Sequence, residues 1–166
     1  MEKTVFFIRH AKSSWKNLNL RDHDRPLNKR GKRDGPIMSN IILAKEGPIQ
    51  QIITSTAVRA KETAKYFAKT HGVKKKDFVE ESDIYHGDTL DYLSAARVWG
   101  NDEYDQIAVF AHNPGMNYLA NTFTDRYIGN VPTAGVLKVV FDVERYKEIN
   151  QSNGRLEAFY YPKMFL

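Results

Sequence analysis

The feature that most constrains the fold is an alternation of short apolar runs with longer stretches of helical periodicity. The apolar runs have the length and composition of buried strands. They predict strands near residues 3–9, 49–54, 106–111 and 135–142, with helices near 35–45, 57–71, 89–100 and 115–124. Strands that alternate with helices build a mostly parallel sheet between two helical layers. The expected fold class is α/β, a three-layer α/β/α sandwich with a mostly parallel central sheet.

Smaller signals complete the predicted architecture. Phe78-Val79 indicates a short edge strand, and residues 155–161 indicate a late strand joined to 135–142 by a hairpin through the turn 150–154. Polar and apolar residues alternate from Leu137 to Asp142, which predicts that this hairpin turns one face to water. Because Gly35-Pro36 interrupts the first helical stretch, we expect that helix to start near Asp34 with Pro36 in its first turn. Its core stripe would then be Ile37, Ile41 and Leu43-Ala44.

A cation and an imidazole stand where the first predicted strand ends. Arg9 and His10 directly follow the apolar run 5–8, and residues 11–14 then offer a small polar turn with free N–H groups. Open α/β sheets bind their ligands at this edge, and such a turn suits an anion such as phosphate. Arg9 and His10 are therefore candidate site residues, with a solvated strand end as the alternative.

A second candidate cation lies at the start of a predicted helix. Ser55 or Thr56 can cap this helix, and apolar residues recur at helical spacing from Ala57 to Ala68. Arg59 then falls in the first turn, where the helix macrodipole disfavours a cation unless an anion binds the same helix end. Arg59 is expected to face an anion, with an ordinary surface arginine as the alternative.

A second histidine repeats the arrangement of the first. The apolar run 107–111 ends in His112, and Asn113-Pro114-Gly115 follows as a turn. A histidine on an apolar strand is more often a satisfied core residue than a catalyst. His112, however, terminates its strand and does not interrupt it, so it repeats the geometry of the first site.

These motifs together resemble the histidine phosphatase superfamily, whose fold is phosphoglycerate mutase-like. The resemblance spans about residues 3–143 and is closest to the small SixA-type branch, the phosphohistidine phosphatases. It implies that His10 is the nucleophile, that the phosphoryl group is bound by Arg9, Arg59 and His112, and that the chain needs no metal. The segments that carry it are 9–15, 24–27 with Arg30-Gly31, 55–64, 112–115 and 132–135.

Four further residues of these motifs are candidate substrate-binding groups. Thr133 resembles the family's threonine beside the pocket, although a turn threonine can equally bond its own backbone. The other three flank the two histidines; they are Lys12, Ser13 and Asn113.

The chemistry of phosphoryl transfer supports these roles independently. The reaction needs positioning and neutralisation of the oxygens, which the forked guanidiniums of Arg9 and Arg59 can provide. To attack phosphorus His10 must be neutral, and neighbouring cations lower the pKa of an imidazole. We expect a backbone carbonyl to fix its tautomer. Attack would give a phosphohistidine, which water then hydrolyses.

The proton donor for the leaving group is less well defined. Many relatives carry a glutamate in a Leu-x-Glu pattern, and the corresponding stretch 81–88 places His86 at that position. His86 is the candidate donor, with Asp83 and Asp88 as alternatives, but Asp88 also has the position of a helix N-cap. A phosphorylated imidazole departs with less proton assistance than an alkyl alcohol. A missing carboxylic acid therefore favours a phosphoramidate substrate over a sugar phosphate.

Length and composition limit the remaining possibilities. With 166 residues, 42% of them hydrophobic, the chain fits a single histidine phosphatase domain over 1–166. No segment is long enough to form the lid that covers the pocket of the metabolic mutases, so we expect an open pocket. Trp15 and residues 16–23 would form one rim of it. Such a pocket can admit a phosphorylated side chain of another protein. The absence of cysteine excludes cysteine-based phosphatase chemistry and disulfides.

The sequence predicts neither a cofactor nor a membrane anchor. We expect no metal because no His, Asp and Glu residues have metal-ligand spacing, and no nucleotide because a Gly-rich fingerprint is absent. Neither a leader nor an apolar run of about 20 residues is present, which predicts a cytoplasmic protein without a membrane span.

The formal net charge of +5 is compatible with binding to nucleic acid. The basic clusters 29–33 and 74–76 lack interleaved aromatic residues for base stacking, and they serve equally well to steer an anionic phosphoprotein. The expected partner is a protein that carries phosphohistidine, or a small phosphate ester, and not nucleic acid. The alternatives are a general small phosphomonoesterase or acyl phosphatase of the same fold, or a non-catalytic phosphate- or nucleic-acid-binding module.

Overall fold

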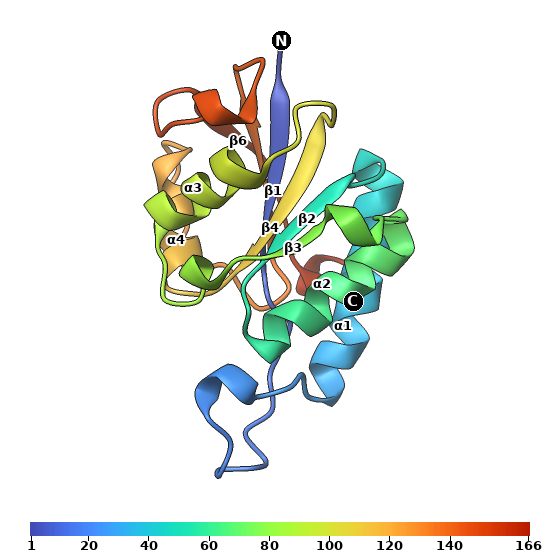
Figure 1. Cartoon of the computed structure of the whole chain (residues 1–166). Coiled ribbons are helices and arrows are strands. Elements are labelled where there is room, and N and C mark those ends of the chain that lie inside the picture. The colour runs from blue at the N-terminus through green and yellow to red at the C-terminus, as the bar shows by residue number, and fades with distance from the viewer.

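A six-stranded sheet forms the centre of the computed structural model, which describes all 166 residues (Figure 1). The strand order is β3-β2-β4-β1-β5-β6. Strands β3, β2, β4 and β1 pair in parallel, whereas β5 pairs antiparallel with both β1 and β6, so β5 alone runs against the others. The strands are β1 (Lys3–Arg9), β2 (Gln51–Thr54), β3 (Phe78–Glu80), β4 (Gln106–Ala111), β5 (Val136–Phe141) and β6 (Gly154–Tyr160).

Helices cover both faces of the sheet, which confirms the predicted α/β/α sandwich. Helices α1 and α2 pack together on one face, and α3 and α4 lie on the other (Figure 1). Each face has its own buried apolar cluster. The helices are α1 (Lys29–Glu46), α2 (Val58–His71), α3 (Thr89–Trp99) and α4 (Gly115–Thr122). None of them combines the length and hydropathy needed to span a bilayer.

Strand β1 is buried on both faces because it lies between β4 and β5 with helices above and below. Val5 and Phe7 pack into the cluster under α3 and α4, and Phe6 and Ile8 pack into the cluster under α1 and α2. The parallel register with β4 pairs Arg9 with Ala111. The residues that follow β1 and β4 therefore leave the sheet at the same edge.

The start of helix α1 differs from the prediction. The helix begins at Lys29, not near Asp34, because the side chain of Asn28 accepts a hydrogen bond from the Gly31 N–H at 2.9 Å and caps it. Pro36 consequently lies inside the helix and not in its first turn. The sequence signal was misleading because an internal proline removes one hydrogen bond without ending this helix.

The buried face of α1 also differs from the predicted stripe. Met38 and Ile42 are completely buried, whereas Ile37 and Ile41 are half-buried and Ala44 is exposed. The observed buried face also includes two polar residues, Asp34 and Ser39. Asp34 pairs with Arg30 and Arg33, and Ser39 is hydrogen-bonded to Thr70. A search for apolar periodicity alone does not find this face.

The predicted wet face of the β5–β6 hairpin is wrong for β5. Val140 is buried, and Lys138 forms an ion pair with Glu46 of α1 at 2.7 Å, because α1 covers this side of the strand. Only the edge strand β6 alternates between half-buried and exposed residues along its first half.

Helix α1 is fixed against the loop that follows β1 through Gly31. A Cβ atom at Gly31 would lie 2.2 Å from the carbonyl oxygen of Lys12, which is backbone and cannot move aside cheaply. Gly31→Ala would ordinarily favour a helix by about 1 kcal/mol. Here we expect overpacking to lower the free energy of unfolding by about 1–3 kcal/mol. Urea unfolding measures this, with Lys32→Ala on the exposed face as control. A more stable Gly31→Ala protein would show that the loop does not rest on α1.

Candidate active site

The three predicted centres converge at the carboxyl edge of the sheet. His10 follows β1, His112 follows β4, and Arg59 stands in the first turn of α2 after β2. The ring centroids of the two histidines are 5.1 Å apart, and Arg59 Nε lies 3.4 Å from His10 Nε2. All three side chains are buried. The parallel register thus brings together residues that are about fifty positions apart in sequence.

The tautomer of His10 is fixed by its own backbone surroundings. Its Nδ1 lies 2.7 Å from the carbonyl oxygen of Ala11, which can only accept, so Nδ1 carries the proton. Nε2 is left with a lone pair facing Arg59. Burial lowers the pKa of His10 to about 3; the Ala11 carbonyl opposes this shift, and the charges of Arg59, Arg9 and Arg25 add to it. The expected direction and the expected carbonyl partner are both found, although burial outweighs the cations as the cause.

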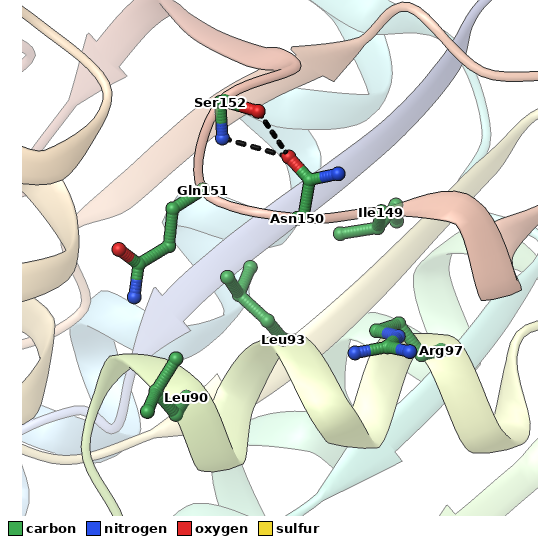
Figure 2. Close-up of a pocket in the computed structure, with 7 residues that line it drawn as sticks. All are labelled: Leu90, Leu93, Arg97, Ile149, Asn150, Gln151 and Ser152. Atoms are coloured by element: carbon green, nitrogen blue, oxygen red, sulfur yellow. Dashed lines mark hydrogen bonds between the residues drawn. The ribbon is translucent and has the colours of Figure 1, made fainter.

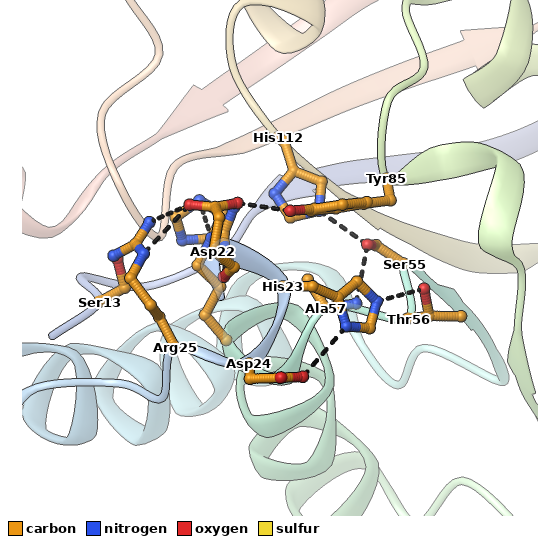
Figure 3. A network of polar contacts seen from close by, with 12 residues as sticks. Ser13, Asp22, His23, Asp24, Arg25, Ser55, Thr56, Ala57, Tyr85 and His112 are labelled. Carbon is orange, nitrogen blue, oxygen red and sulfur yellow. Dashed lines mark hydrogen bonds and ion pairs between the residues drawn. The ribbon is translucent and has the colours of Figure 1, made fainter. Parts of the chain in front are cut away.

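His112 is a buried ring that is hydrogen-bonded to Ser55. The Ser55 hydroxyl accepts from the Ala57 N–H at 3.2 Å and lies 2.7 Å from His112 Nε2 (Figure 3). The hydroxyl can donate its proton to Nε2, and in that tautomer the ring proton lies on Nδ1. Burial is the largest cause that lowers the pKa of His112 to about 2, and the neighbouring His10 and Arg59 lower it further. The ring therefore offers a neutral N–H donor.

Helix α2 begins without a side-chain cap, contrary to the prediction for Ser55 or Thr56. Its N-cap is Ala57. Ser55 directs its hydroxyl to His112, and Thr56 lies 2.8 Å from His23 Nε2. Ser55 also accepts from the N–H of Ala57 itself, but neither hydroxyl caps the N–H groups of the first helical turn.

Two buried donors at this edge have no partner in the protein. Arg9 Nη1 donates to the Val131 carbonyl at 2.9 Å, but Arg9 Nε is buried without an acceptor, and so is His112 Nδ1. Buried polar atoms are nearly always hydrogen-bonded. An oxyanion held between these residues would satisfy both donors, and phosphate oxygens form strong bonds with guanidinium N–H groups.

The structure adds three residues that sequence reasoning did not assign to the site. Asp22 Oδ2 accepts from Arg59 Nη2 at 2.9 Å and from the Tyr85 hydroxyl at 2.6 Å (Figure 3). Its Oδ1 accepts from Arg25 Nη2 at 2.9 Å. Arg25 is buried and also donates to Ser13 Oγ at 2.6 Å. Arg25 was part of the family resemblance, but nothing in a short polar loop indicates that its side chain turns inward.

Asp22 is an internal anion of the cluster. Burial alone would raise its pKa, but hydrogen bonds from Tyr85, Arg25 and Arg59 outweigh burial and hold the pKa well below its ordinary value. The carboxylate therefore stays ionised and is no proton donor at neutral pH. It occupies guanidinium N–H groups that a phosphoryl group would also use.

The candidate substrate-binding residues have different surroundings. Lys12 is exposed, and Ser13 is buried against Arg25. The Asn113 amide donates to the Val131 carbonyl at 3.1 Å. Thr133 is half-buried, and the next residue, Ala134, donates its N–H to the His10 carbonyl at 3.0 Å. The turn before β5 thereby braces the backbone of His10.

None of the three candidate proton donors contacts His10. His86 is exposed, with its ring centroid 4.3 Å from that of Tyr85, and Asp83 is exposed as well. Asp88 caps α3, where its Oδ1 accepts from the Leu90 N–H at 3.1 Å. From this segment Tyr85 is the residue that reaches the site, with its ring centroid 5.6 Å from that of His112.

A pocket of about 580 Å³ lies apart from this cluster, between α3 and residues 149–152 (Figure 2). Its only charged lining residue is Arg97, and the side chains of Asn150 and Ser152 bond each other at 2.6 Å. The lining contains no histidine and no carboxylate, so it lacks acid–base groups. No group of three or more His, Cys, Asp or Glu side chains in the structure could hold a metal ion.

Comparisons with known proteins identify a family to which the sequence is similar. The sequence model of the histidine phosphatase superfamily (branch 1) matches residues 5–91. An uncharacterized chloroplastic protein of Arabidopsis thaliana is 42% identical over 128 residues, which cover 73% of this chain and 59% of that protein. The chain thus spans less than two thirds of the length of this relative.

Solved structures of similar fold cover nearly the whole chain. The structure of the protein histidine phosphatase SixA complexed with tungstate has a TM-score of 0.80 at 19% identity and covers 98% of this chain and 99% of that one. A candidate SixA phosphohistidine phosphatase of Agrobacterium tumefaciens has a TM-score of 0.76 at 25% identity, with coverages of 96% and 98%.

The two buried neutral histidines make stability depend on pH. In the folded protein the pKa values of His10 and His112 are lowered to about 3 and about 2, whereas an unfolded histidine titrates near 6.5. Between these values the unfolded chain binds more protons, so stability falls as the pH falls below about 6.5. Each histidine should contribute a slope that approaches about 1.4 kcal/mol per pH unit as the pH falls well below 6.5. Urea unfolding between pH 5 and 6.5 measures it, and His10→Asn should reduce the slope by one histidine's share. An equal slope in both proteins would contradict a neutral His10.

The Asp22 carboxylate competes with an anion for Arg59 and Arg25. Asp22→Asn removes this competition, and because the pair is partly exposed we expect inorganic phosphate or vanadate to bind about two- to fivefold more tightly. Isothermal titration at pH 7 measures the affinity. Asp24→Asn is the matched control, since Asp24 lies on the same loop but pairs with Arg21 and His23. Weaker anion binding by Asp22→Asn alone would show that Asp22 positions the arginines and does not compete.

Proposed function

The chain belongs to the histidine phosphatase superfamily, and from that membership we propose that it is a metal-free phosphatase that acts through a phosphohistidine formed on His10. The observation that carries the proposal is the state of His10. Its Nδ1–H is bonded to the Ala11 carbonyl, and its buried, neutral Nε2 faces the Arg59 guanidinium. A nucleophile with a fixed lone pair beside a cation is suited to attack a phosphoryl group.

In the proposed reaction the phosphoryl oxygens are bound by the guanidiniums of Arg9, Arg59 and Arg25 and by the Nδ1–H of His112. Arg9 Nε and His112 Nδ1, which have no protein partner, donate hydrogen bonds to the phosphoryl oxygens, and Asp22 releases the arginine N–H groups that it binds. Fixed donors that need no rearrangement are effective at stabilising charge in the transition state.

The bond changes then follow from the tautomer. Nε2 of His10 forms a bond to phosphorus while the bond from phosphorus to the leaving group breaks. The positive charge that develops on the ring is stabilised by the Ala11 carbonyl, which accepts from Nδ1–H. Water attacks the phosphohistidine in the second half-reaction and releases inorganic phosphate, with Nε2 restored.

We propose phosphohistidine in proteins as the substrate class. Asp22 is the carboxylate bonded within the cluster, and it stays ionised, so an alkyl alcohol would leave without an acid to protonate it. A phosphorylated imidazole needs less proton assistance. The SixA proteins of similar fold, whose names describe protein histidine phosphatases, support the same substrate class. An acyl phosphate also has a good leaving group and is the second candidate for the same reason.

His10→Asn should abolish turnover, by on the order of 10³-fold or more, because it removes the nucleophile. Phosphate release is measured from a phosphohistidine-bearing protein, acetyl phosphate and β-glycerol phosphate, with EDTA present throughout. The unaltered protein should favour phosphohistidine and should carry an alkali-stable ³²P label that is absent from His10→Asn.

Circular dichroism shows whether the variant is folded. Retained hydrolysis by folded His10→Asn would refute the mechanism. A preference for acetyl phosphate or for the alkyl ester would replace the substrate class but keep the nucleophile. Tight binding of phosphate without turnover of any substrate would indicate a binding module.

A further inference from the structure

A large basic groove lies beside the proposed phosphate site. It encloses about 1300 Å³ between the loop that follows β1 and the start of α1. No aspartate or glutamate lines it, and six cations do. We define the basic groove by these cations, which are Lys12, Lys16, Lys29, Arg30, Lys32 and Arg33.

The charge of the groove is largely uncompensated. Arg30 and Arg33 share one carboxylate, the completely buried Asp34, at 3.5 and 2.9 Å. The four lysines take part in no ion pair of the structure and are exposed. Like charges gathered along one concave surface raise the local potential and attract anions. A ligand with several negative charges therefore fits this surface.

The groove is linked to the proposed active site by a chain of hydrogen bonds. Its floor is a backbone bridge in which Ser13 pairs with Leu27, and the Asn28 N–H donates to the Lys12 carbonyl at 2.9 Å. From this floor Ser13 Oγ accepts a hydrogen bond from Arg25, which binds Asp22 next to Arg59 (Figure 3). A chain whose phosphorylated residue reaches His10 would lay its neighbouring residues along the groove.

The segment around Tyr85, residues 81–88, contains carboxylates and no lysine or arginine. Figure 3 places Arg25 and Ser13 to one side of Asp22 and Tyr85 to the other. Exposed carboxylates stand close to Tyr85 in the chain, at Asp83 and Asp88. An acidic segment is therefore attracted on the groove side and repelled on the Tyr85 side. Such asymmetry selects for acidic residues on only one side of the phosphorylated residue.

We propose that the basic groove binds an acidic segment of the phosphoprotein substrate, on one side of its phosphohistidine. This inference rests on the proposed function. Trp15 is the groove's one aromatic residue, and the Arg25 guanidinium covers its ring at 3.6 Å, so the groove lacks the series of open rings on which nucleic acid bases stack. Lysine ammonium groups on flexible stems suit carboxylates that are attracted by charge without fixed geometry.

The test uses three histidine-phosphorylated peptides of identical core sequence. One has four glutamates before the phosphohistidine, one has them after it, and the third has glutamines at both places. The value of kcat/KM should be about tenfold higher for one glutamate peptide than for the other two. This advantage should shrink in 300 mM salt, because mobile ions screen exposed charges.

Matched variants separate the groove from general charge. Lys29→Glu/Lys32→Glu reverses two charges of the groove, and Lys75→Glu/Lys76→Glu makes the same change on exposed lysines that do not line it. Only the groove variant should lose most of the tenfold preference. Both variants should hydrolyse the glutamine peptide at the rate of the unaltered protein.

A binding measurement keeps the two proposals apart. In a Trp99→Phe background, Trp15 is the remaining tryptophan, and it lines the groove. A change in its fluorescence therefore reports the binding of an unphosphorylated glutamate peptide. Peptide binding that Lys29→Glu/Lys32→Glu abolishes supports the groove even if no phosphopeptide is hydrolysed, an outcome that refutes only the proposed function.

Two outcomes overturn the groove proposal while the phosphatase stands. The first is equal kcat/KM for the three peptides together with an unchanged Trp15 signal. The second is a single-stranded oligonucleotide that binds the groove more tightly than the glutamate peptide does, which would assign the surface to nucleic acid.

Discussion

The site depends on strand β1 being held from both sides. β1 is hydrogen-bonded to β4 and to β5, and its side chains from Val5 to Ile8 are completely buried. A strand fixed in this way leaves the sheet at one defined point, and the parallel register with β4 sets His10 beside His112. The turn before β5 then closes on the His10 carbonyl through Ala134. Rigid elements position catalytic groups more precisely than loops do, and His10 inherits that precision directly from the core.

Gathering three arginines around a buried imidazole is electrostatically unfavourable, and the fold offsets it in three ways. His10 and His112 remain neutral, so they add no charge. Asp22 supplies one carboxylate to Arg59 and Arg25. Arg9 bonds the Val131 carbonyl but retains an unpartnered Nε. The compensation is thus incomplete, and the positive charge that remains is complementary to an oxyanion. The stability given up at this edge is what makes the cluster receptive to phosphate.

Sequence reasoning succeeded where a strong local pattern decides the structure. Apolar runs that end in Arg9-His10 and in His112 fixed both strands and their functional edge, and the capping pattern at Asp88 gave the start of α3. It failed where a decision depends on contacts between distant segments. Whether Arg25 turns inward depends on Ser13, Asp22 and Arg59, and no local periodicity encodes that. The first turn of α1 was missed because Asn28 caps it ahead of a proline that suggested a later start.

The loop that carries Arg25 connects the proposed active site to the basic groove. Arg25 touches the proposed phosphate site through Asp22 and the basic groove through Ser13, so it lies between the two. An anion that displaces Asp22 from Arg25 therefore acts on a residue bonded to the groove floor. The positive charge of the basic groove lies on one side of this loop, and the His10 imidazole lies on the other. Both therefore contribute to the potential that an anionic substrate meets. A substrate recognised by both would be selected for its phosphoryl group and for the acidity of its surroundings at once.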